Sequence, residues 1–164
     1  RHPHVFSDGT ARTSEEVLDR WQLIKQAENG EVPTSALGDV PMHLPALMRA
    51  FKIQHKAAKV GFDWKNAADV IPKVLEEVQE LRAAHDANDA RGMEAEVGDM
   101  LFASVNLSRH LGVDPEVALG SAVAKFVRRF TYVEEAARKA GRCICKMSLE
   151  EMDKLWNDAK ESGL

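Results

Sequence analysis

Acidic side chains are concentrated in two short stretches of this 164-residue chain. The first stretch holds Glu76, Glu77 and Glu80, and the second holds Glu96 and Asp99. Each stretch contains two acids that are three residues apart, so on a helix they share one face and lie about 4.5 Å apart along the axis. Neighbouring like charges weaken a helix by roughly 0.2–0.5 kcal/mol per pair. The concentration of charge therefore indicates a ligand that compensates it.

The segment between the two stretches reads DANDARG and is rich in residues that form turns. A short connection of this kind makes the flanking helices antiparallel neighbours. With Asn88 as the midpoint, Glu80 and Glu96 are each eight residues away from the turn. Glu77 and Asp99 are each eleven residues away. The sequence therefore predicts that the four carboxylates face one another as two matched pairs across a helical hairpin.

Such a cluster predicts a metal site. Four converging carboxylates cannot all remain ionised without compensation, because desolvation and mutual repulsion both raise their pKa values. Ligation by carboxylates alone favours a hard cation, so we expect Mg²⁺, with Mn²⁺ as a possible substitute. Zinc is disfavoured because no His or Cys joins the cluster, and a di-iron site is excluded because none of the six His follows a Glu by three positions. The alternative for the first stretch alone is a solvated acidic surface.

Start and stop signals predict an all-α fold without strands or internal repeats. The fourth predicted helix has apolar side chains round much of its circumference, so we expect it to be deeply buried. Pro72 is expected to kink the third helix or to mark its true start. The predicted helices cover residues 14–28, 45–61, a segment from Asn66 onward, 90–111, 114–140 and a segment from Ser148 through Trp156.

Composition narrows the class of protein. The chain is 45% hydrophobic and 29% charged, as in ordinary globular domains. Its net charge of −4 and pI near 5.9 argue against a nucleic-acid partner. There is neither an apolar run near the roughly 20 residues that span a bilayer nor a signal-peptide pattern. We therefore expect a cytoplasmic protein without a membrane partner, with residues 1–43 as an N-terminal arm or linker and residues 44–164 as the functional domain.

The first residue and the two cysteines give two further expectations. The chain begins at Arg1 instead of Met, which is expected of a processed product or a fragment, although a naturally short form remains an alternative. Cys143 and Cys145 are separated by one residue, a spacing that suits neither a disulfide free of strain nor a Cys-x-x-Cys zinc site. We expect both cysteines to be reduced and without a role.

An ordered series of sequence blocks resembles the MazG family of nucleoside triphosphate pyrophosphohydrolases, within the all-α NTP pyrophosphatase superfamily. The resemblance extends over about residues 44–160, and the order of the blocks makes it specific. The blocks are GFDW at 61–64, EEVQE at 76–80, EVGDMLF at 96–102 with Asn106 and Arg109 after it, PEVAL at 115–119, KFVRRF at 125–130 and Trp156.

The resemblance implies both the residues of the site and an assembly. It implies an antiparallel helical hairpin core that a second copy completes into a four-helix-bundle-like homodimer. The opening residues resemble the junction that follows an N-terminal copy of the domain in two-domain members, which implies that this chain is the C-terminal domain. The implied metal ligands are Glu77, Glu80, Glu96 and Asp99. The implied triphosphate and base contacts are Lys125, Arg129, Trp156 and Lys160.

Helical spacing supplies a physical reason for the implied substrate contacts. Lys125 and Arg129 are four residues apart and share a face, where a Lys point charge and an Arg fork suit phosphate oxygens. The alternative is a solvated basic face. Trp156 and Lys160 have the same spacing, so a base can stack on the indole while the lysine reaches a phosphate. The alternative is that Trp156 only packs the last helix onto the rest.

Three further residues, two aromatic and one polar, lie in or next to the quoted blocks. Phe62 and Trp64 are expected to belong to the core instead of a base pocket. Asn106 lies seven residues, or two helical turns, after Asp99, so its amide is a weaker candidate for substrate contact.

The resulting hypothesis is Mg²⁺-dependent hydrolysis of an NTP or dNTP to a nucleoside monophosphate and pyrophosphate, by attack of water at the α-phosphorus. Glu77 or Glu80 is expected to accept the proton of the water, and Glu76 to orient a metal ligand. Lys125 and Arg129 would stabilise the leaving pyrophosphate. Two alternatives remain open. The same fold can act on dUTP or phosphoribosyl-ATP, or the chain can be a non-catalytic helical module that binds another protein.

Overall fold

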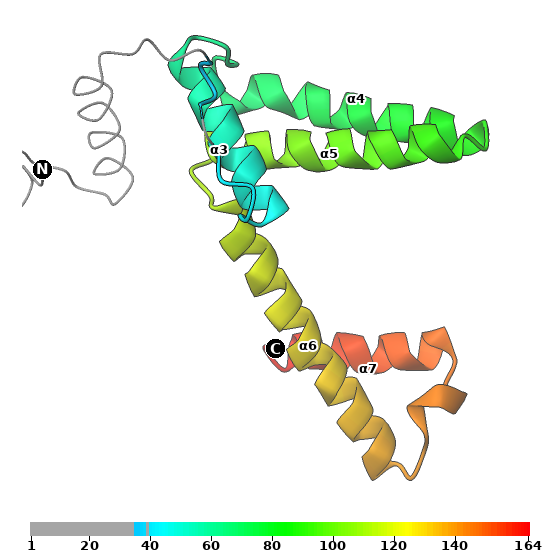
Figure 1. Ribbon diagram of the computed structural model, residues 1–164. Coiled ribbons are helices and arrows are strands. Elements are labelled where there is room, and N and C mark those ends of the chain that lie inside the picture. Colours follow the sequence, from blue (N-terminus) through cyan, green and yellow to red (C-terminus); the bar gives the residue numbers. More distant parts are fainter. Residues whose placement is uncertain (1–34, 39) are drawn as a thin grey trace, which may run out of the picture.

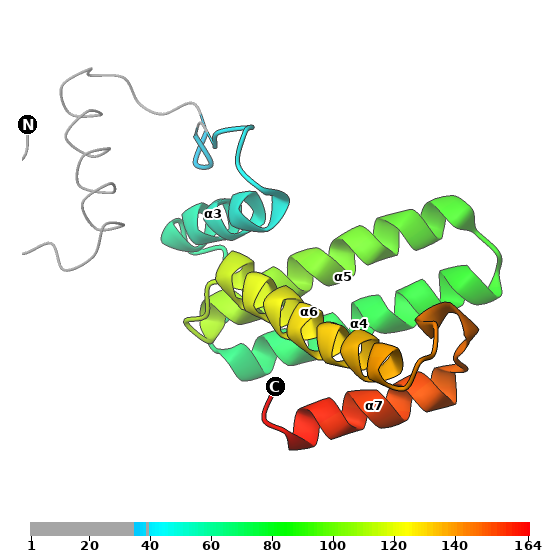
Figure 2. The ribbon, with the colours of Figure 1, turned by 90° about the horizontal axis from the view of Figure 1, so that it is seen from below.

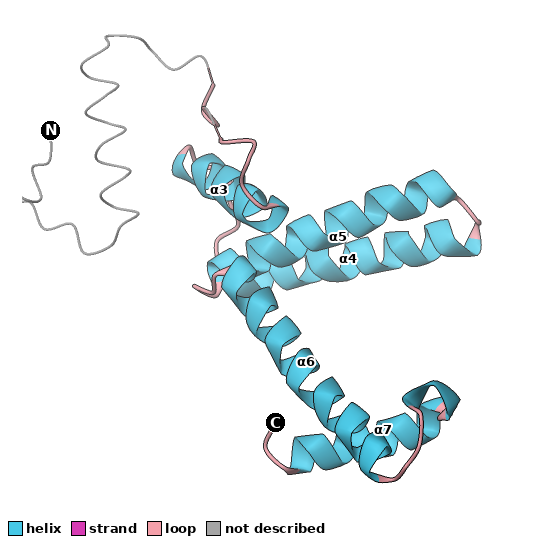
Figure 3. Cartoon of the chain, turned by 60° about the horizontal axis from the view of Figure 1, so that its bottom comes forward, coloured by secondary structure: helices cyan, strands magenta, loops and turns pink. Residues whose placement is uncertain are grey.

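The computed structural model describes residues 35–38 and 40–164, and its regular elements are all helices (Figures 1 and 3). This confirms the predicted all-α class for the described part of the chain. The predicted helix over residues 14–28 lies outside it. The elements are α3 (Ala46–Lys59), α4 (Ala67–Asp86), α5 (Ala90–His110), α6 (Pro115–Lys139), the 3-10 turn η1 (Ile144–Lys146) and α7 (Leu149–Glu161). No helix among these has the length and apolar character needed to cross a membrane.

Helices α4 and α5 form the predicted antiparallel hairpin, side by side along their lengths (Figure 1). Asn88 is at the tip with a φ of 54°, in the left-handed region that Asn tolerates better than most residues. The carboxylate of Asp89 then caps α5, because it accepts hydrogen bonds from the backbone N–H groups of Arg91 and Gly92 at 3.2 and 3.1 Å. The turn therefore has the midpoint that its sequence predicts.

The start of α4 is set by Asn66 and not by Pro72. The Asn66 side chain accepts a hydrogen bond from the backbone N–H of Asp69 at 3.1 Å, which is the N-cap arrangement. The helix then continues over Pro72, within the region of its second turn. Proline at this place removes one backbone donor but does not end the helix. The alternative that Pro72 marks the true start of the helix is wrong.

Helix α6 leaves the open end of the hairpin and runs away from it, with α7 packed along its far part (Figures 1 and 2). Its start is the predicted one, since the carboxylate of Asp114 accepts hydrogen bonds from the N–H groups of Glu116 and Val117 at 2.9 and 3.0 Å. Helix α3 packs on α5 and on the beginning of α6. The hairpin and the α6–α7 pair are thus two arms that spread from a common base.

The spread leaves large apolar faces uncovered. The largest fully buried side chains of the described residues are Val70 on α4 and Val133 on α6. Leu101 and Phe102 on α5 remain 49% and 45% exposed. The prediction that this helix is deeply buried is therefore wrong for a single chain, because α6 and α7 do not cover it. Exposed apolar residues on α4 and α6 include Ile71, Leu75, Val78, Val117, Leu119, Val123, Phe126 and Val127.

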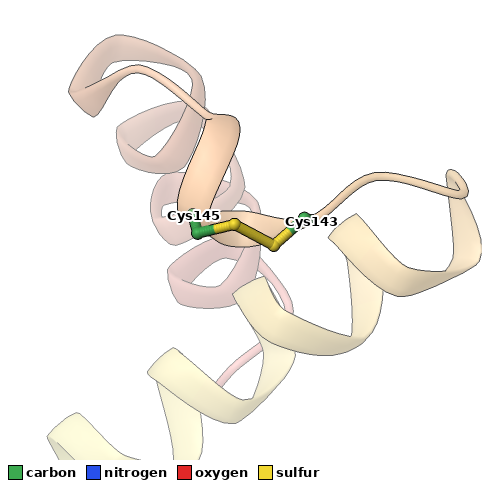
Figure 4. Close-up of a disulfide and its surroundings, with 2 residues drawn as sticks. All are labelled: Cys143 and Cys145. Atoms are coloured by element: carbon green, nitrogen blue, oxygen red, sulfur yellow. A yellow bond between two sulfur atoms is a disulfide. The ribbon is translucent and has the colours of Figure 1, made fainter.

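The connection from α6 to α7 contains a disulfide between Cys143 and Cys145 (Figure 4). The expectation that both cysteines are reduced is wrong in this structure. The chain bends into η1 directly after Cys143, and the bend places the two Cα atoms 5.2 Å apart. This separation is within the range of about 4.4–6.8 Å that disulfides require.

Helix α7 begins with the predicted capping box. The Ser148 hydroxyl accepts a hydrogen bond from the Glu151 N–H, and the Glu151 carboxylate accepts one from the Ser148 N–H. Arg142 donates to the same carboxylate at 2.7 and 3.1 Å. The Arg142 hydrogen bonds, with that of the Ser148 N–H, lower the pKa of Glu151 from its ordinary value of 4.5 to about 2.

This cap predicts a pH-dependent stability. Because the pKa of Glu151 is lowered in the folded state, its charge stabilises the fold above pH 4.5, and the stabilisation is lost as the pH falls toward 2. Glu151→Gln is therefore expected to unfold at a lower temperature than the wild type at neutral pH, with a difference that shrinks on acidification below pH 4.5. Thermal unfolding followed by circular dichroism measures this, with Glu150→Gln as the matched control. A difference that stays constant with pH would contradict the role of the ionised cap.

Candidate functional site

Three carboxylates of the hairpin come together. Glu77, on α4, and Glu96 and Asp99, on α5, each offer an oxygen, and these oxygens all lie within 4.8 Å of one another. The Glu77 side chain is almost fully buried, Glu96 is half-buried and Asp99 is exposed, so the group opens from the packed face toward the surface. The convergence expected from the sequence is thus present for three of the four acids.

Glu80 is not a member of this group, yet it acts on it. Partial burial and the negative charge of Glu80, followed by those of Glu77 and Asp99, raise the pKa of Glu96 above its ordinary value. The charge of Glu80 on α4 therefore acts on Glu96 on α5, the residue that lies at the same distance from the turn in the sequence. Three to four hard oxygen donors with unfavourable mutual repulsion fit a divalent cation such as Mg²⁺ or Mn²⁺.

Lys73 is a member of the site that the sequence reasoning missed. Its Nζ lies 2.6 Å from Glu77 Oε1 and 3.3 Å from Glu76 Oε1. The hydrogen bond to Glu77 is the main cause that raises the pKa of Lys73. Its spacing of three and four residues before the two glutamates was a usable signal, because side chains at this spacing meet on a helix. Glu76 is thus held by Lys73 at the edge of the cluster and is half exposed.

A cavity of about 370 Å³ lies between α3, α4 and α5, next to the carboxylates. Its volume is within the range of roughly 300–1,000 Å³ that is typical of small-molecule sites. Glu77 and Asp99 form part of its wall, so an ion held by the carboxylates would contact a molecule in the cavity. The lining residues are Gln54, Phe62, Asp63, Trp64, Val70, Lys73, Glu77, Asp99, Phe102, Ala103, Asn106 and Arg109.

The expectation that Phe62 and Trp64 belong to the core is wrong. Phe62 is 79% exposed and Trp64 is 42% exposed, and both line the cavity. They lie in the connection between α3 and α4, which is exposed and does not enter the packed interior. An aromatic wall of this kind is typical of sites that bind a planar ligand.

Polar residues hold another side of the cavity in place. Arg109 contacts Asp63 through its guanidinium and donates to Asn106 Oδ1 at 2.8 and 3.1 Å. His110 Nε2 lies 2.9 Å from Asp63 Oδ1. Partial burial acts to raise the pKa of Asp63, but the hydrogen bonds from Arg109 and His110 outweigh it and lower that pKa. Asn106 is buried and lines the cavity, and its Oδ1 accepts hydrogen bonds from Arg109. This amide therefore holds the Arg109 side chain in place at the wall of the cavity.

The four predicted substrate contacts lie on the other arm. Arg129 places its guanidinium over the Trp156 ring, 5.7 Å from the centroid, and its Nε donates to the Leu164 carbonyl at 2.7 Å. Trp156 also packs against Phe126, at 5.1 Å between ring centroids. Lys125 and Lys160 are exposed. None of the four is among the residues that line the cavity, so one chain does not bring them to the carboxylates.

Fold and site together define an all-α protein with a carboxylate cluster, suited to a divalent cation, on the wall of an open cavity. Residues 65–134, which include the whole hairpin, match the MazG nucleotide pyrophosphohydrolase domain. This part of the chain is therefore similar to the MazG nucleotide pyrophosphohydrolase domain, in agreement with the resemblance that the sequence blocks indicate.

Similar proteins extend the likeness beyond the matched domain. The chain is 47% identical over 167 residues to the nucleoside triphosphate pyrophosphohydrolase of Escherichia coli strain K12, in an alignment with 100% of this chain and 64% of the relative. It is 43% identical over 160 residues to the nucleoside triphosphate pyrophosphohydrolase/pyrophosphatase MazG of Thermotoga maritima, with 98% and 60% covered. It is 48% identical over 167 residues to the protein YabN of Bacillus subtilis, with 99% and 33% covered. The chain thus spans less than two thirds of the length of each of these relatives.

Proposed function

We propose that this chain hydrolyses nucleoside triphosphates, ribo or deoxy, to the monophosphate and pyrophosphate in a reaction that depends on Mg²⁺. The observation that carries the proposal is the convergence of Glu77, Glu96 and Asp99 beside a cavity, within the residues that match the MazG domain. A triphosphate needs cations to offset its charge, and three converging carboxylates are suited to hold one. The cavity beside it has room for the rest of a nucleotide.

In the proposed mechanism the hairpin carboxylates hold the ion and activate water. Glu77, Glu96 and Asp99 would bind Mg²⁺, with Glu80 as the fourth ligand. When bound, Mg²⁺ supplies charge stabilisation for the phosphate oxygens. Glu77 or Glu80 accepts the proton of the water that attacks the α-phosphorus. Glu76, which shares Lys73 with Glu77, would help to orient Glu77 as a metal ligand.

The proposed assembly is a homodimer in which the second copy completes the site. The many exposed large apolar side chains of α4, α5 and α6 support this, since large apolar patches on a protein surface often mark interfaces. Packing of two copies would turn each hairpin into part of a four-helix bundle. Lys125 and Arg129 of one copy would then reach the phosphates held by the other, where their charge stabilises the leaving pyrophosphate. Trp156 and Lys160 would contact the base and a phosphate.

A substrate panel tests the proposed reaction. NTPs, dNTPs, dUTP and phosphoribosyl-ATP are incubated with the chain and Mg²⁺, and the products are separated by chromatography. We expect monophosphate and pyrophosphate in equal amounts from NTPs or dNTPs, with loss of activity in EDTA and recovery with Mg²⁺ or Mn²⁺. Release of orthophosphate and a diphosphate would mean that another bond is cleaved. Turnover of dUTP or phosphoribosyl-ATP alone would assign the same fold a different substrate, and complete inactivity would favour the protein-interaction module.

Some expectations about the wider protein remain predictions. The resemblance of the opening residues to a junction between two domains implies that residues 1–43 are an arm or linker and that residues 44–164 are the C-terminal domain of a two-domain protein. The composition predicts a cytoplasmic location and neither nucleic acid nor membrane as a partner. The full-length coding sequence and the location of the tagged native protein would test them.

A further inference from the structure

The connection from α6 to α7 contains the only two cysteines of the chain, and both are exposed. Cys143 and Cys145 form a disulfide, with their Cα atoms 5.2 Å apart (Figure 4). The bond closes around the start of η1, where the Lys146 N–H donates a hydrogen bond to the Cys143 carbonyl at 3.0 Å. Reagents in the solvent can therefore reach a bond that spans the bend of this connection.

A disulfide in this position is readily reduced, for two physical reasons. The stabilisation that a disulfide gives to a fold grows with the length of the loop that it closes, and this bond joins residues only two positions apart. Exposed disulfides are also generally the labile or regulatory ones, whereas structural disulfides resist reduction. The predicted cytoplasmic location agrees with this, because disulfides in that compartment are usually transient and catalytic or redox-sensing.

Two basic residues flank the pair and favour thiol–disulfide exchange. Arg142 directly precedes Cys143, and Lys146 directly follows Cys145. Positive charge beside a cysteine favours its thiolate, which is the form that attacks a disulfide. Arg142 is also the residue whose guanidinium binds the Glu151 carboxylate in the cap of α7. The cysteine pair thus lies next to the contact that joins this connection to the start of α7.

We propose that Cys143 and Cys145 are a reversible redox site that exchanges with thiol reductants, and that its state sets how firmly the connection from α6 to α7 is held. In the exchange, two reductant thiols give up two electrons and two protons and become one disulfide. The S–S bond between Cys143 and Cys145 breaks, and each of the two sulfurs takes one proton. The oxidised state keeps residues 143–145 in the bend, and the reduced state releases them.

A redox titration tests whether the site is reversible. The chain is equilibrated in buffers with different ratios of reduced to oxidised glutathione, free thiols are alkylated, and the alkyl groups on each chain are counted by mass spectrometry. Since the chain has no other cysteine, the signal belongs to this pair. We expect the pair to become reduced as the ratio rises and to become oxidised again when the ratio is lowered. A pair that stays oxidised in excess reduced glutathione, or that stays reduced in oxidised glutathione, would overturn the proposal.

Limited proteolysis tests the effect on the connection. Trypsin cleaves after Arg142 and Lys146, on either side of the pair, and after Arg91 near the tip of the hairpin, which reports any effect of the buffer on trypsin itself. Because reduction frees a loop of about three residues, we expect cleavage in the connection to be roughly 10-fold faster in the reduced state, with cleavage after Arg91 unchanged.

The matched control is the double variant Cys143→Ser/Cys145→Ser, in which the rate of cleavage in the connection is expected to be the same in both buffers. Equal rates in the oxidised and reduced wild type, or a difference that persists in the double variant, would overturn the proposal. Neither measurement uses a nucleotide, so the result is independent of the proposed function.

Discussion

Asp99→Asn is expected to lower Mg²⁺-dependent pyrophosphate release by more than about 100-fold. Loss of groups that only support metal ligands typically costs about 10–100-fold in metal affinity or activity, and a direct ligand is expected to exceed this range. Asp99 is the member of the cluster that suits the test, since it is exposed and its replacement leaves the packed interior intact. Replacement of the buried Glu77 would instead leave Lys73 without its main partner.

Two measurements separate the loss of the metal from a general defect in Asp99→Asn. Steady-state release of pyrophosphate gives the catalytic effect. Thermal unfolding with and without Mg²⁺ gives binding, because a ligand of the folded state raises its midpoint. We expect the wild type and Glu94→Gln, an exposed acid on the same helix, to show the Mg²⁺-induced rise, and Asp99→Asn to lose it. An Asp99→Asn protein with full activity and an unchanged Mg²⁺ response would remove the cluster from the mechanism.

Mixing two inactive variants is expected to restore activity if the site is shared between two copies. Asp99→Asn disables the carboxylate half of a site and Lys125→Ala disables the basic half. When equal amounts of the two chains are denatured and refolded together, half of the dimers contain one chain of each kind. In each such dimer, one of the two sites combines the intact carboxylates of the Lys125→Ala chain with the intact basic residues of the Asp99→Asn chain. We therefore expect about a quarter of the wild-type activity. Lys125 is preferable to Arg129 here because Arg129 also packs on Trp156.

The control for this complementation uses two variants of the same half. Asp99→Asn mixed with Glu96→Gln has a defective carboxylate half in every site, so no activity is expected. Recovery in the first mixture but not in the second would support a site formed between copies. Absence of recovery in both mixtures, with mixed dimers demonstrated by affinity tags, would mean that each chain supplies both halves of its own site, which the spread of α6 from the hairpin makes difficult.

Local signals in the sequence predicted the helices, but not what covers them. Helix caps and tight turns depend on residues only three or four positions apart, so the sequence predicts them. This holds for the caps at Asn66, Asp114 and Ser148 and for the turn at Asn88. Burial of α5 depends on distant elements. The apolar circumference of that helix was correctly seen, but periodicity shows which faces are apolar and not which surface packs against them. The disulfide between the cysteines could likewise not be predicted, because the spacing of two cysteines does not show that the chain bends between them at η1.

The candidate site was predictable to the extent that it depends on the hairpin. Equal distances from Asn88 placed Glu77 opposite Asp99, and the structure brings them together. Glu80 is one turn nearer the tip of the hairpin and lies outside the tight group. Gln54 could not be recognised, because a glutamine within a helix is ordinarily a surface residue, and its burial follows from the packing of α3 on α5. The cavity likewise forms only because α3 packs against the hairpin, so it could not be predicted from the sequence.

The two arms that spread from a common base have a consequence for how this protein must be handled. In the proposed homodimer, the second molecule would cover the apolar sides of α4, α5 and α6 and would supply much of the stability of each chain. Folding and association would then be linked by mass action, so we expect the midpoint of thermal unfolding to rise with protein concentration. Dilution would then lower both the stability of the fold and the catalytic activity per chain. Assays at nanomolar protein would therefore underestimate the activity of the enzyme at higher concentrations.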